Sequence, residues 1–221
     1  MIVITGASDG LGKEIAKLYK DAGKNVVNVS RTQSDYAQVN ILHDLREGSE
    51  INAAANEILD IDEPLEILIN CAGVYSNQPL GTITEDEIKK TMATNVKAPI
   101  LLVSYLIDRI KKDGTDIVNV ASNVALKANP DEAVYGASKW AVRGFTKNLQ
   151  LELKNYPCRV ISFCPGGFAT QLFIKATGED KTKDGSKWML ASEVALTLKQ
   201  ALDLPKNMEI SEIVLNRKAS K

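Results

Sequence analysis

The chain has 221 residues, with 27 basic and 28 acidic side chains and a formal net charge of −1. This balance gives no electrostatic reason to expect a nucleic acid or an anionic membrane as a partner. The single histidine, His43, excludes a metal site with several histidine ligands, and we expect no bound metal.

The sequence carries no pattern that would place the protein outside the cytoplasm. No apolar run reaches the ~18 residues of a membrane span. The first predicted strand begins at Ile2, which leaves no room for a signal peptide. The three cysteines have neither C-x-x-C spacing nor an obvious pairing, so we expect them to be reduced. We therefore expect a cytoplasmic protein.

Short apolar runs bounded by turn residues predict seven strands. Several of these runs are apolar on both faces, which is typical of parallel strands covered by helices on both sides of a sheet. The predicted strands are Ile2–Thr5, Val26–Ser30, Gln38–Ile41, Leu65–Asn70, Asp116–Ser122, Arg159–Cys164 and Glu209–Leu215.

Helical patterns fill most of the intervals between these strands. The first helix has apolar residues at helical spacing from Leu11 onward and ends at Gly23. Thr84 and Glu87 form a capping-box pattern at the start of a long helix that runs toward Lys112.

A second long helix is predicted from Asn129-Pro130, an N-cap followed by proline at the first helical position, to about Asn155. Strands and helices thus alternate along the chain. This alternation predicts an α/β fold, a doubly wound and mostly parallel seven-stranded sheet with helices on both faces. Because no linker or repeat divides the sequence, residues 1–221 are predicted to form a single domain.

The loop between the first strand and the first helix has the composition of a diphosphate-binding turn. Gly6 permits a tight turn, Gly10 lets the backbone approach a pyrophosphate, and Gly12 lets the helix pack on the strand. The helix N-terminus then attracts the anion. Ser8, Asp9 and Leu11 complete the candidate contacts of this loop. Three glycines can also form a purely structural turn.

The end of the second strand bears on the choice between NAD and NADP. Many NAD enzymes place a carboxylate there to hold the ribose 2′-hydroxyl. This chain has Ser30-Arg31-Thr32, so no carboxylate repels a 2′-phosphate, and Arg31 can bind one. The sequence therefore favours NADP, with Arg31 and Thr32 as contacts. The alternative is that Arg31 is a solvated surface side chain.

Tyr135 and Lys139 lie four residues apart on one face of the second long helix. A free tyrosine is a poor acid–base group at neutral pH, but a nearby ammonium stabilises the phenolate and lowers its pKa. Such a pair also occurs by chance on amphipathic helices.

Taken together, these residues resemble the short-chain dehydrogenase/reductase family over essentially the whole chain, and its C-terminal tail is similar to that of small NADP-preferring carbonyl reductases. The resemblance implies a Rossmann fold and an NADP cofactor. The further positions that carry it are Asp44 and Leu45 after the third strand, Asn70, Ala72 and Gly73 after the fourth, Asn95, Ser122, and the segment with Pro165, Gly166 and Thr170 that holds the nicotinamide.

The resemblance also implies catalytic roles. Tyr135 would protonate the carbonyl oxygen as hydride arrives, or act as the base in reverse. Ser122 would hydrogen-bond that oxygen, and Lys139 would bind the nicotinamide ribose and lower the tyrosine pKa. Asn95 would hold a water that passes protons to solvent. Ser122 could instead merely end a strand, and Asn95 could be a buried amide satisfied by the backbone.

The substrate is expected to be a small carbonyl or alcohol compound. A segment at about 168–190 would cover it, with Leu172, Phe173, Trp188 and Tyr75 as candidate lining residues. Alternatives are a cofactor-binding sensor or scaffold without turnover, and another Rossmann-type enzyme such as a methyltransferase.

A homodimer is expected, with a tetramer possible. The helices Glu85–Lys112 and Asp131–Asn155 would pair with their symmetry mates, as in relatives of this fold. We expect that the apolar residues of these helices cannot all face the sheet: Ile100, Val103, Ile107, Trp140, Phe145 and Leu149.

Overall fold

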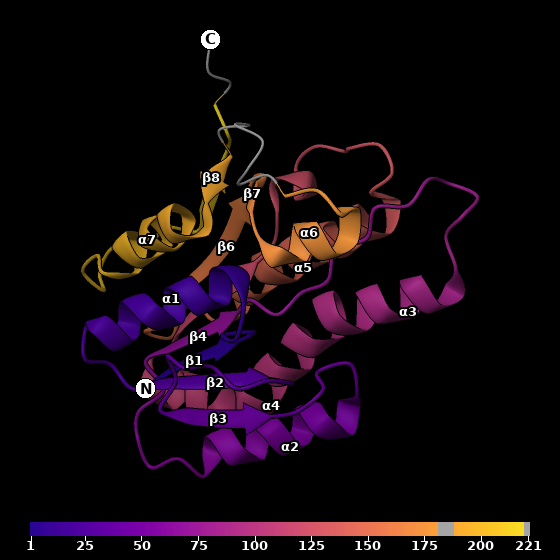
Figure 1. The fold of residues 1–221 in the computed structure, drawn as a ribbon. Coiled ribbons are helices and arrows are strands. Elements are labelled where there is room, and N and C mark those ends of the chain that lie inside the picture. The colour runs from indigo at the N-terminus through magenta and orange to yellow at the C-terminus, as the bar shows by residue number, and fades with distance from the viewer. Residues whose placement is uncertain (181–187, 219–221) are drawn as a thin grey trace.

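The computed structural model describes residues 1–180 and 188–218 and contains a parallel sheet between two layers of helices (Figure 1). Across the described residues, the main sheet has seven strands in the order β3-β2-β1-β4-β5-β6-β9, all parallel. The predicted doubly wound α/β fold is therefore confirmed. The strands are β1 (Ile2–Thr5), β2 (Val26–Ser30), β3 (Val39–Leu42), β4 (Ile67–Asn70), β5 (Asp116–Val120), β6 (Val160–Pro165) and β9 (Glu212–Leu215).

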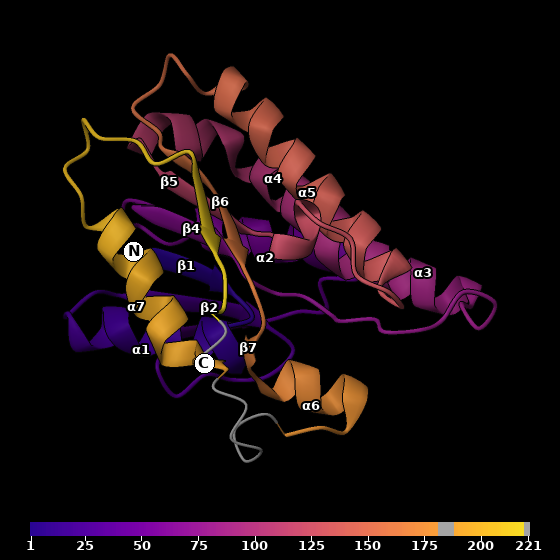
Figure 2. The same ribbon diagram turned by 90° about the horizontal axis from the view of Figure 1, so that it is seen from above.

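Helices cover both faces of this sheet. One face is covered by α1 (Gly10–Asp21) and α7 (Ala191–Leu202), which pack against each other. The other is covered by α2 (Gly48–Leu59), α4 (Ala98–Asp113) and α5 (Ala133–Glu152). Figure 2 shows the two groups on opposite sides of the strands.

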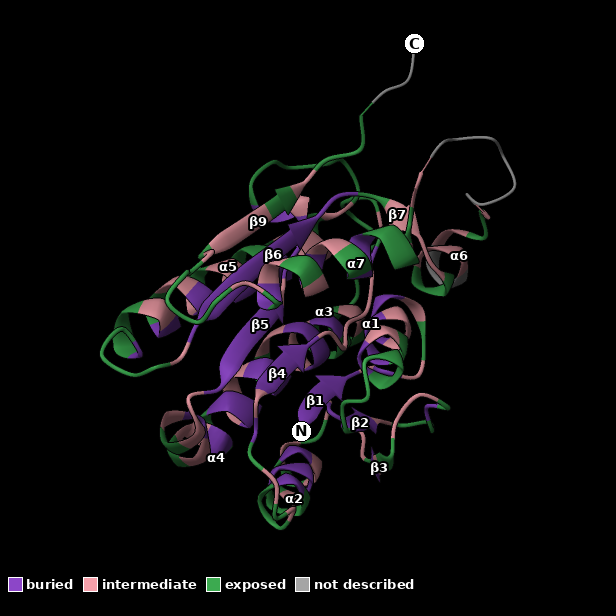
Figure 3. Cartoon of the chain, turned by 90° about the vertical axis from the view of Figure 1, so that its left-hand side faces the viewer, coloured by how far each residue is buried: buried purple, intermediate pink, exposed green. Residues whose placement is uncertain are grey.

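The core divides in the same way. One apolar cluster lies between the sheet and α1 with α7, and a second lies between the sheet and the opposite helices. The central strands are buried along their length, as Figure 3 shows for β4, β5 and β6. Burial on both faces explains why these strands read as continuous apolar runs. In the described part of the chain, no helix combines the length and the apolar character needed to cross a membrane.

The remaining elements lie mostly beyond the carboxyl edge of the sheet. They are α3 (Glu85–Met92), a π-helix (Ala93–Lys97), a 3₁₀ turn (Asn123–Ala125), the two-stranded pair β7 (Phe168–Ala169) and β8 (Met189–Leu190), and α6 (Gln171–Thr177). The strand order reverses between β1 and β4. In open α/β sheets, ligands bind at such a switch point, beyond the carboxyl ends of the strands.

Two predicted helix boundaries need correction. The pair Asn129-Pro130 does not start α5, which begins at Ala133 after Glu132. Asp131 has φ of +60°, and this left-handed backbone cannot continue into a helix. The predicted helix from Glu85 to Lys112 is divided by the π-helix into α3 and α4, although Thr84 does cap its start by accepting a hydrogen bond from the Glu87 N–H at 3.2 Å.

As expected, the apolar residues of the long helices do not all face the sheet. Val103 and Leu149 are buried in the core, and Ile107 and Phe145 pack against it. Trp140 is the member of the set that stays open, with 51% of its surface exposed. α4 and α5 each bury a broad apolar face against the sheet and its neighbours, and Trp140 lies outside that face.

Candidate active site

The switch point brings the glycine loop after β1 against the chain that follows β4. The Thr5 hydroxyl accepts hydrogen bonds from the N–H groups of Cys71 (3.0 Å) and Ala72 (2.9 Å). A Cβ on Gly6, whose φ is +74°, would lie 3.0 Å from the Ala72 Cα. Close backbone contact therefore fixes the two loops relative to each other. Thr5 is a positioning residue that the sequence argument passed over.

The glycine loop leads directly into α1. A Cβ on Gly12 would lie 2.3 Å from the Gly6 carbonyl oxygen, so only glycine fits there. Gly10 has φ of +52° and begins the helix. Asp9 caps α1, accepting a hydrogen bond from the Gly10 N–H at 2.7 Å, while Leu11 is buried in the core. The loop thus has the backbone geometry of an anion cradle, with Asp9 and Leu11 in structural roles.

Next to this cradle lies the end of β2. The Ser30 hydroxyl lies 3.3 Å from that of Ser8 and donates to the carbonyl of Thr32 at 2.7 Å. Arg31 is exposed. It is also close enough to Asp44 to contribute, after the larger effect of the Arg46 hydrogen bond, to lowering the pKa of that carboxyl. The end of β2 and the turn after β3 therefore form one polar region beside the glycine loop.

The side chains of two predicted cofactor contacts, Leu45 and Asn70, mainly contact other protein side chains. The Leu45 side chain is packed in the core, which leaves its main chain beside Asp44. The amide nitrogen of Asn70 donates to the Asn119 side-chain oxygen at 2.8 Å. The Asn70 side-chain oxygen is buried without a hydrogen-bond partner among the described residues.

The predicted catalytic residues converge beyond the end of β5. Ser122 follows that strand, Tyr135 and Lys139 lie on α5, and Ser122 is near enough to Tyr135 to lower the pKa of its phenol. The Lys139 ammonium lies 5.7 Å from the centroid of the Tyr135 ring and donates to the carbonyl of Val120 at 2.9 Å. The structure therefore brings the three side chains together.

Burial controls the pKa values of this group. It raises the pKa of Tyr135 to about 12 and lowers that of Lys139 to about 8. The sequence predicts that Lys139 lowers the pKa of Tyr135, whereas in this structure burial raises that pKa, with Ser122 opposing the rise and the charge of Glu132 adding to it. A protonated phenol at neutral pH suits the role of proton donor.

Asn95 lies inside the π-helix. Its side chain accepts a hydrogen bond from the Val74 N–H (2.8 Å) and donates to the Val74 carbonyl and the Ser138 hydroxyl (both 3.0 Å). A Cβ on Gly73 would lie 3.4 Å from the Asn95 side-chain oxygen and 3.7 Å from the Lys139 ammonium. Asn95 therefore fixes the chain after β4 beside Lys139, with its amide satisfied by neighbouring groups.

The segment after β6 reaches the same place. The Gly166 N–H donates to the Leu215 carbonyl at 2.7 Å, and the Pro165 carbonyl lies 3.5 Å from the Ser122 hydroxyl. Thr170 caps α6, and its methyl group would lie 3.8 Å from a Cβ on Gly10. The predicted nicotinamide segment thus lies between Ser122 and the glycine loop.

Aromatic side chains extend from Tyr135 toward the expected substrate cover. Ring centroids are 4.9 Å apart for Tyr135 and Tyr75, 5.9 Å for Tyr75 and Phe173, and 4.8 Å for Phe173 and Trp188. These residues come from three separate segments. The part of the expected 168–190 cover at 181–187 lies outside the described residues.

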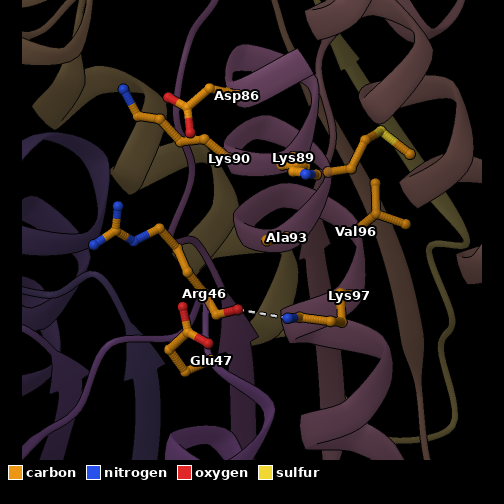
Figure 4. A pocket seen from close by; sticks show the side chains of 9 residues that line it. Arg46, Glu47, Asp86, Lys89, Lys90, Ala93, Val96 and Lys97 are labelled. Atoms are coloured by element: carbon orange, nitrogen blue, oxygen red, sulfur yellow. Dashed lines mark hydrogen bonds between the residues drawn. The ribbon is translucent and has the colours of Figure 1, made fainter.

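A surface pocket of about 560 Å³ lies elsewhere, between the start of α2 and the α3–π-helix segment (Figure 4). Its cations largely have partners: Lys97 donates to the Arg46 carbonyl at 2.5 Å, and Lys89 pairs with Glu85 at 2.6 Å. None of the predicted site residues lines it. The lining residues are Arg46, Glu47, Asp86, Lys89, Lys90, Met92, Ala93, Val96 and Lys97.

Comparison with known proteins agrees with this geometry. A family model described as short chain dehydrogenase matches residues 1–181. The chain is 31% identical over 202 residues to L-xylulose reductase from Caenorhabditis elegans, an alignment that covers 84% of this chain and 76% of that protein. The structure is similar to serine dehydrogenase complexed with NADP⁺, with a TM-score of 0.88, 21% identity and coverage of 100% of this chain and 98% of that one. It is also similar to 4-hydroxyisoleucine dehydrogenase complexed with NADH and succinate, with a TM-score of 0.81, 25% identity and 97% coverage of both chains.

Proposed function

The chain belongs to the short-chain dehydrogenase/reductase family of oxidoreductases, and we propose that it transfers a hydride between NADP(H) and a small carbonyl or secondary alcohol. The observation that carries this proposal is the convergence of Ser122, Tyr135 and Lys139 beside the glycine loop. A binding protein without turnover has no need of a half-buried phenol beside both a serine and an ammonium.

The residues at the switch point fit a dinucleotide. Gly6 and Gly12 let the loop pack against Ala72 and against itself more closely than a Cβ would allow, Gly10 has a positive φ, and the N-terminus of α1 would favour the charge of a diphosphate. Ser30 and the exposed Arg31 suit a 2′-phosphate, which supports NADP over NAD. Asp44, the main chain of Leu45, and the Ala72–Gly73 loop would complete the adenosine half. A reduced nicotinamide near Thr170 would supply the hydride that the carbonyl carbon accepts.

The proton in this reaction comes from Tyr135. Its hydroxyl, protonated at neutral pH, would donate to the carbonyl oxygen as that oxygen gains negative charge. Ser122 would donate a hydrogen bond to the same oxygen and orient it. Lys139 would bind the ribose hydroxyls and stabilise the phenolate that remains. With its side chain engaged, Asn95 would act by holding the Gly73–Val74 chain and Ser138 in place.

The proposal is tested by following NADPH consumption with a panel of aldehydes, ketones and oxo acids, with NADH in parallel. We expect turnover with at least one class and a preference for NADPH. Cofactor binding is measured separately by calorimetry. Tight binding without any turnover would contradict the proposal and favour the sensor or scaffold.

We also propose that the protein is a homodimer. Tyr105 on α4 and Trp140 on α5 are 40% and 51% exposed, large aromatic surfaces for a lone chain to leave in water. Both helices cover the same face of the sheet, and a two-fold axis beside them would pair each helix with its copy in a second chain.

A further inference from the structure

Two loops that are distant in sequence meet beside Tyr135. The Gln78 N–H donates to the carbonyl of Asp131 at 2.7 Å, and the Tyr75 hydroxyl donates to the Glu132 carboxylate at 2.8 Å. Asp131 has positive φ, an unfavourable conformation for a non-glycine residue that persists only where its surroundings enforce it. The contact therefore fixes Glu132 directly ahead of α5.

The Glu132 carboxylate has hydrogen-bonding capacity left. Its donors are the Tyr75 hydroxyl and the Asn129 side-chain amide, the latter at 3.3 Å. An ionised carboxylate accepts about four hydrogen bonds. Glu132 and Tyr75 are both half-buried, so a small molecule can reach the remaining lone pairs.

This carboxylate is electrostatically close to the catalytic phenol. The Tyr75 ring meets the Tyr135 ring edge-on at 4.9 Å, and the charge of Glu132 adds to burial in raising the pKa of Tyr135. Two cations lie near other rings of the site. Lys139 lies over the Tyr135 ring, and Arg217 lies 5.2 Å from Trp188, two aromatic rings beyond Tyr75. Among the residues that the structure describes, Glu132 is the charged group hydrogen-bonded to Tyr75.

We propose that Glu132, held by Tyr75, determines substrate specificity by accepting a hydrogen bond from a hydroxyl or ammonium group next to the reacting carbonyl, and by disfavouring a carboxylate there. This inference rests on the proposed function. It identifies the substrates as hydroxylated or amino carbonyl compounds rather than oxo acids.

The test uses four methyl ketones of the form CH₃–CO–CH₂–X, in which X alone changes: hydroxyacetone (OH), aminoacetone (NH₃⁺), butanone (CH₃) and acetoacetate (CO₂⁻). We expect the kcat/KM of the wild-type protein to be highest for the first two and lowest for acetoacetate. Comparison of hydroxyacetone with aminoacetone shows which donor the site prefers.

Glu132→Gln removes the charge but keeps the size and an acceptor for Tyr75. A hydrogen bond to a charged group is stronger than a neutral one, so kcat/KM for hydroxyacetone and aminoacetone should fall about tenfold relative to butanone, mainly through KM. Acetoacetate should improve by a similar factor. The matched control is Glu152→Gln, an exposed residue near the other end of α5, which should change none of these ratios.

Tyr75→Phe distinguishes the effect of the Glu132 charge from the effect of the Glu132 side-chain orientation. It removes the hydroxyl that orients Glu132 while the carboxylate stays charged, so discrimination against acetoacetate should persist while KM for hydroxyacetone rises. Thermal unfolding of each variant checks that the fold is retained. If Glu132→Gln leaves the four-ketone ratios unchanged within twofold, the proposal is overturned.

The wild-type data separate this inference from the proposed function. If no carbonyl compound is reduced with either cofactor, the proposed function fails. If the protein reduces other carbonyl compounds but not hydroxyacetone or aminoacetone, or prefers butanone or acetoacetate to both, only the inference about Glu132 fails.

Discussion

The candidate site has two ends, one proposed for the cofactor and one for the substrate, and they differ in how far backbone and side chains form them. The proposed cofactor end depends mainly on backbone: the loops after β1 and β4 meet at Gly6 and Ala72, at distances that exclude most side chains, and the Thr5 hydroxyl accepts from two backbone N–H groups. The substrate end consists of side chains, with Tyr75, Glu132 and Phe173 meeting from three separate segments. Backbone geometry leaves little choice of ligand, whereas side chains can be exchanged one at a time. The first end is therefore suited to a shared cofactor and the second to a particular substrate.

The largest expected effect is at the catalytic tyrosine, where the two ends meet. Tyr135→Phe removes the proton donor but keeps the ring that packs against Tyr75. We expect kcat to fall by about 10²–10⁴-fold, the usual worth of general acid catalysis, with cofactor binding retained. Tyr156→Phe, an exposed residue after α5, serves as the control. A loss below tenfold on a substrate whose chemical step limits the rate would contradict the role of Tyr135.

A second test exchanges side chains at the cofactor end. In the double variant Ser30→Asp with Arg31→Leu, a carboxylate replaces the group beside Ser8 and the guanidinium is lost. A charge-assisted hydrogen bond contributes roughly 1.5–3 kcal/mol, so we expect a preference of about ten- to a hundredfold for NADPH in the parent and its inversion in the variant. The measurement is kcat/KM for both cofactors. A parent that already prefers NADH would show that Arg31 is a solvated surface residue.

A third test concerns the proposed dimer, whose interface would lie away from both ends of the candidate site. Trp140→Glu puts a charge on the open face of α5. Loss of a central aromatic contact costs about 2 kcal/mol or more, so the dimer dissociation constant should rise about thirtyfold or more. Light scattering at micromolar concentration measures it. A wild-type protein that is a monomer under these conditions would overturn the proposed dimer.

The smallest expected effect concerns His43, next to Asp44 at the cofactor end. Its ring nitrogens lie 2.6 Å from Glu57 and 2.6 Å from Glu50, and these hydrogen bonds raise the pKa of His43. The stabilisation is therefore complete below the unfolded pKa of about 6.5 and is lost as pH rises through the higher folded value.

Replacement by His43→Gln should lower the free energy of unfolding by about 1 kcal/mol or less near pH 6, and by less at pH 9, because both carboxylates are substantially exposed. Urea unfolding at the two pH values measures the difference. An equal or larger loss at pH 9 would show that the charge of His43 does not contribute.

Local patterns predicted the glycine loop and the neighbouring strands well, and they did not identify Glu132. The bounds of β1 and β2 and the positions of Gly6, Gly10 and Gly12 follow from a few consecutive residues, because strand, turn and helix are adjacent in the chain. Glu132 gave no signal in the sequence. Its importance arises from contact with Tyr75, 57 residues away, which no periodicity encodes.

The errors have the same origin. Asn129-Pro130 has the local chemistry of a helix start, but the hydrogen bond from Gln78 to Asp131 and the left-handed φ of Asp131 delay α5 to Ala133. The pKa of Tyr135 was judged from one neighbouring charge, whereas burial by the surrounding segments decides it. Predictions that depended on tertiary surroundings were therefore the ones that failed.

The π-helix between α3 and α4 has a consequence for how this protein tolerates length changes. In it, the Ala98 N–H bonds to the Ala93 carbonyl, five residues back, so the rod carries one residue more than a regular helix would need. Deleting one residue from 93–97 would remove the extra residue, restore regular pitch and change the direction in which the Asn95 side chain leaves the helix. A change of length that a loop absorbs easily would here displace Asn95 and release the chain that it holds through Val74. The segment is therefore a fixed spacer, where the number of residues matters as much as their identity.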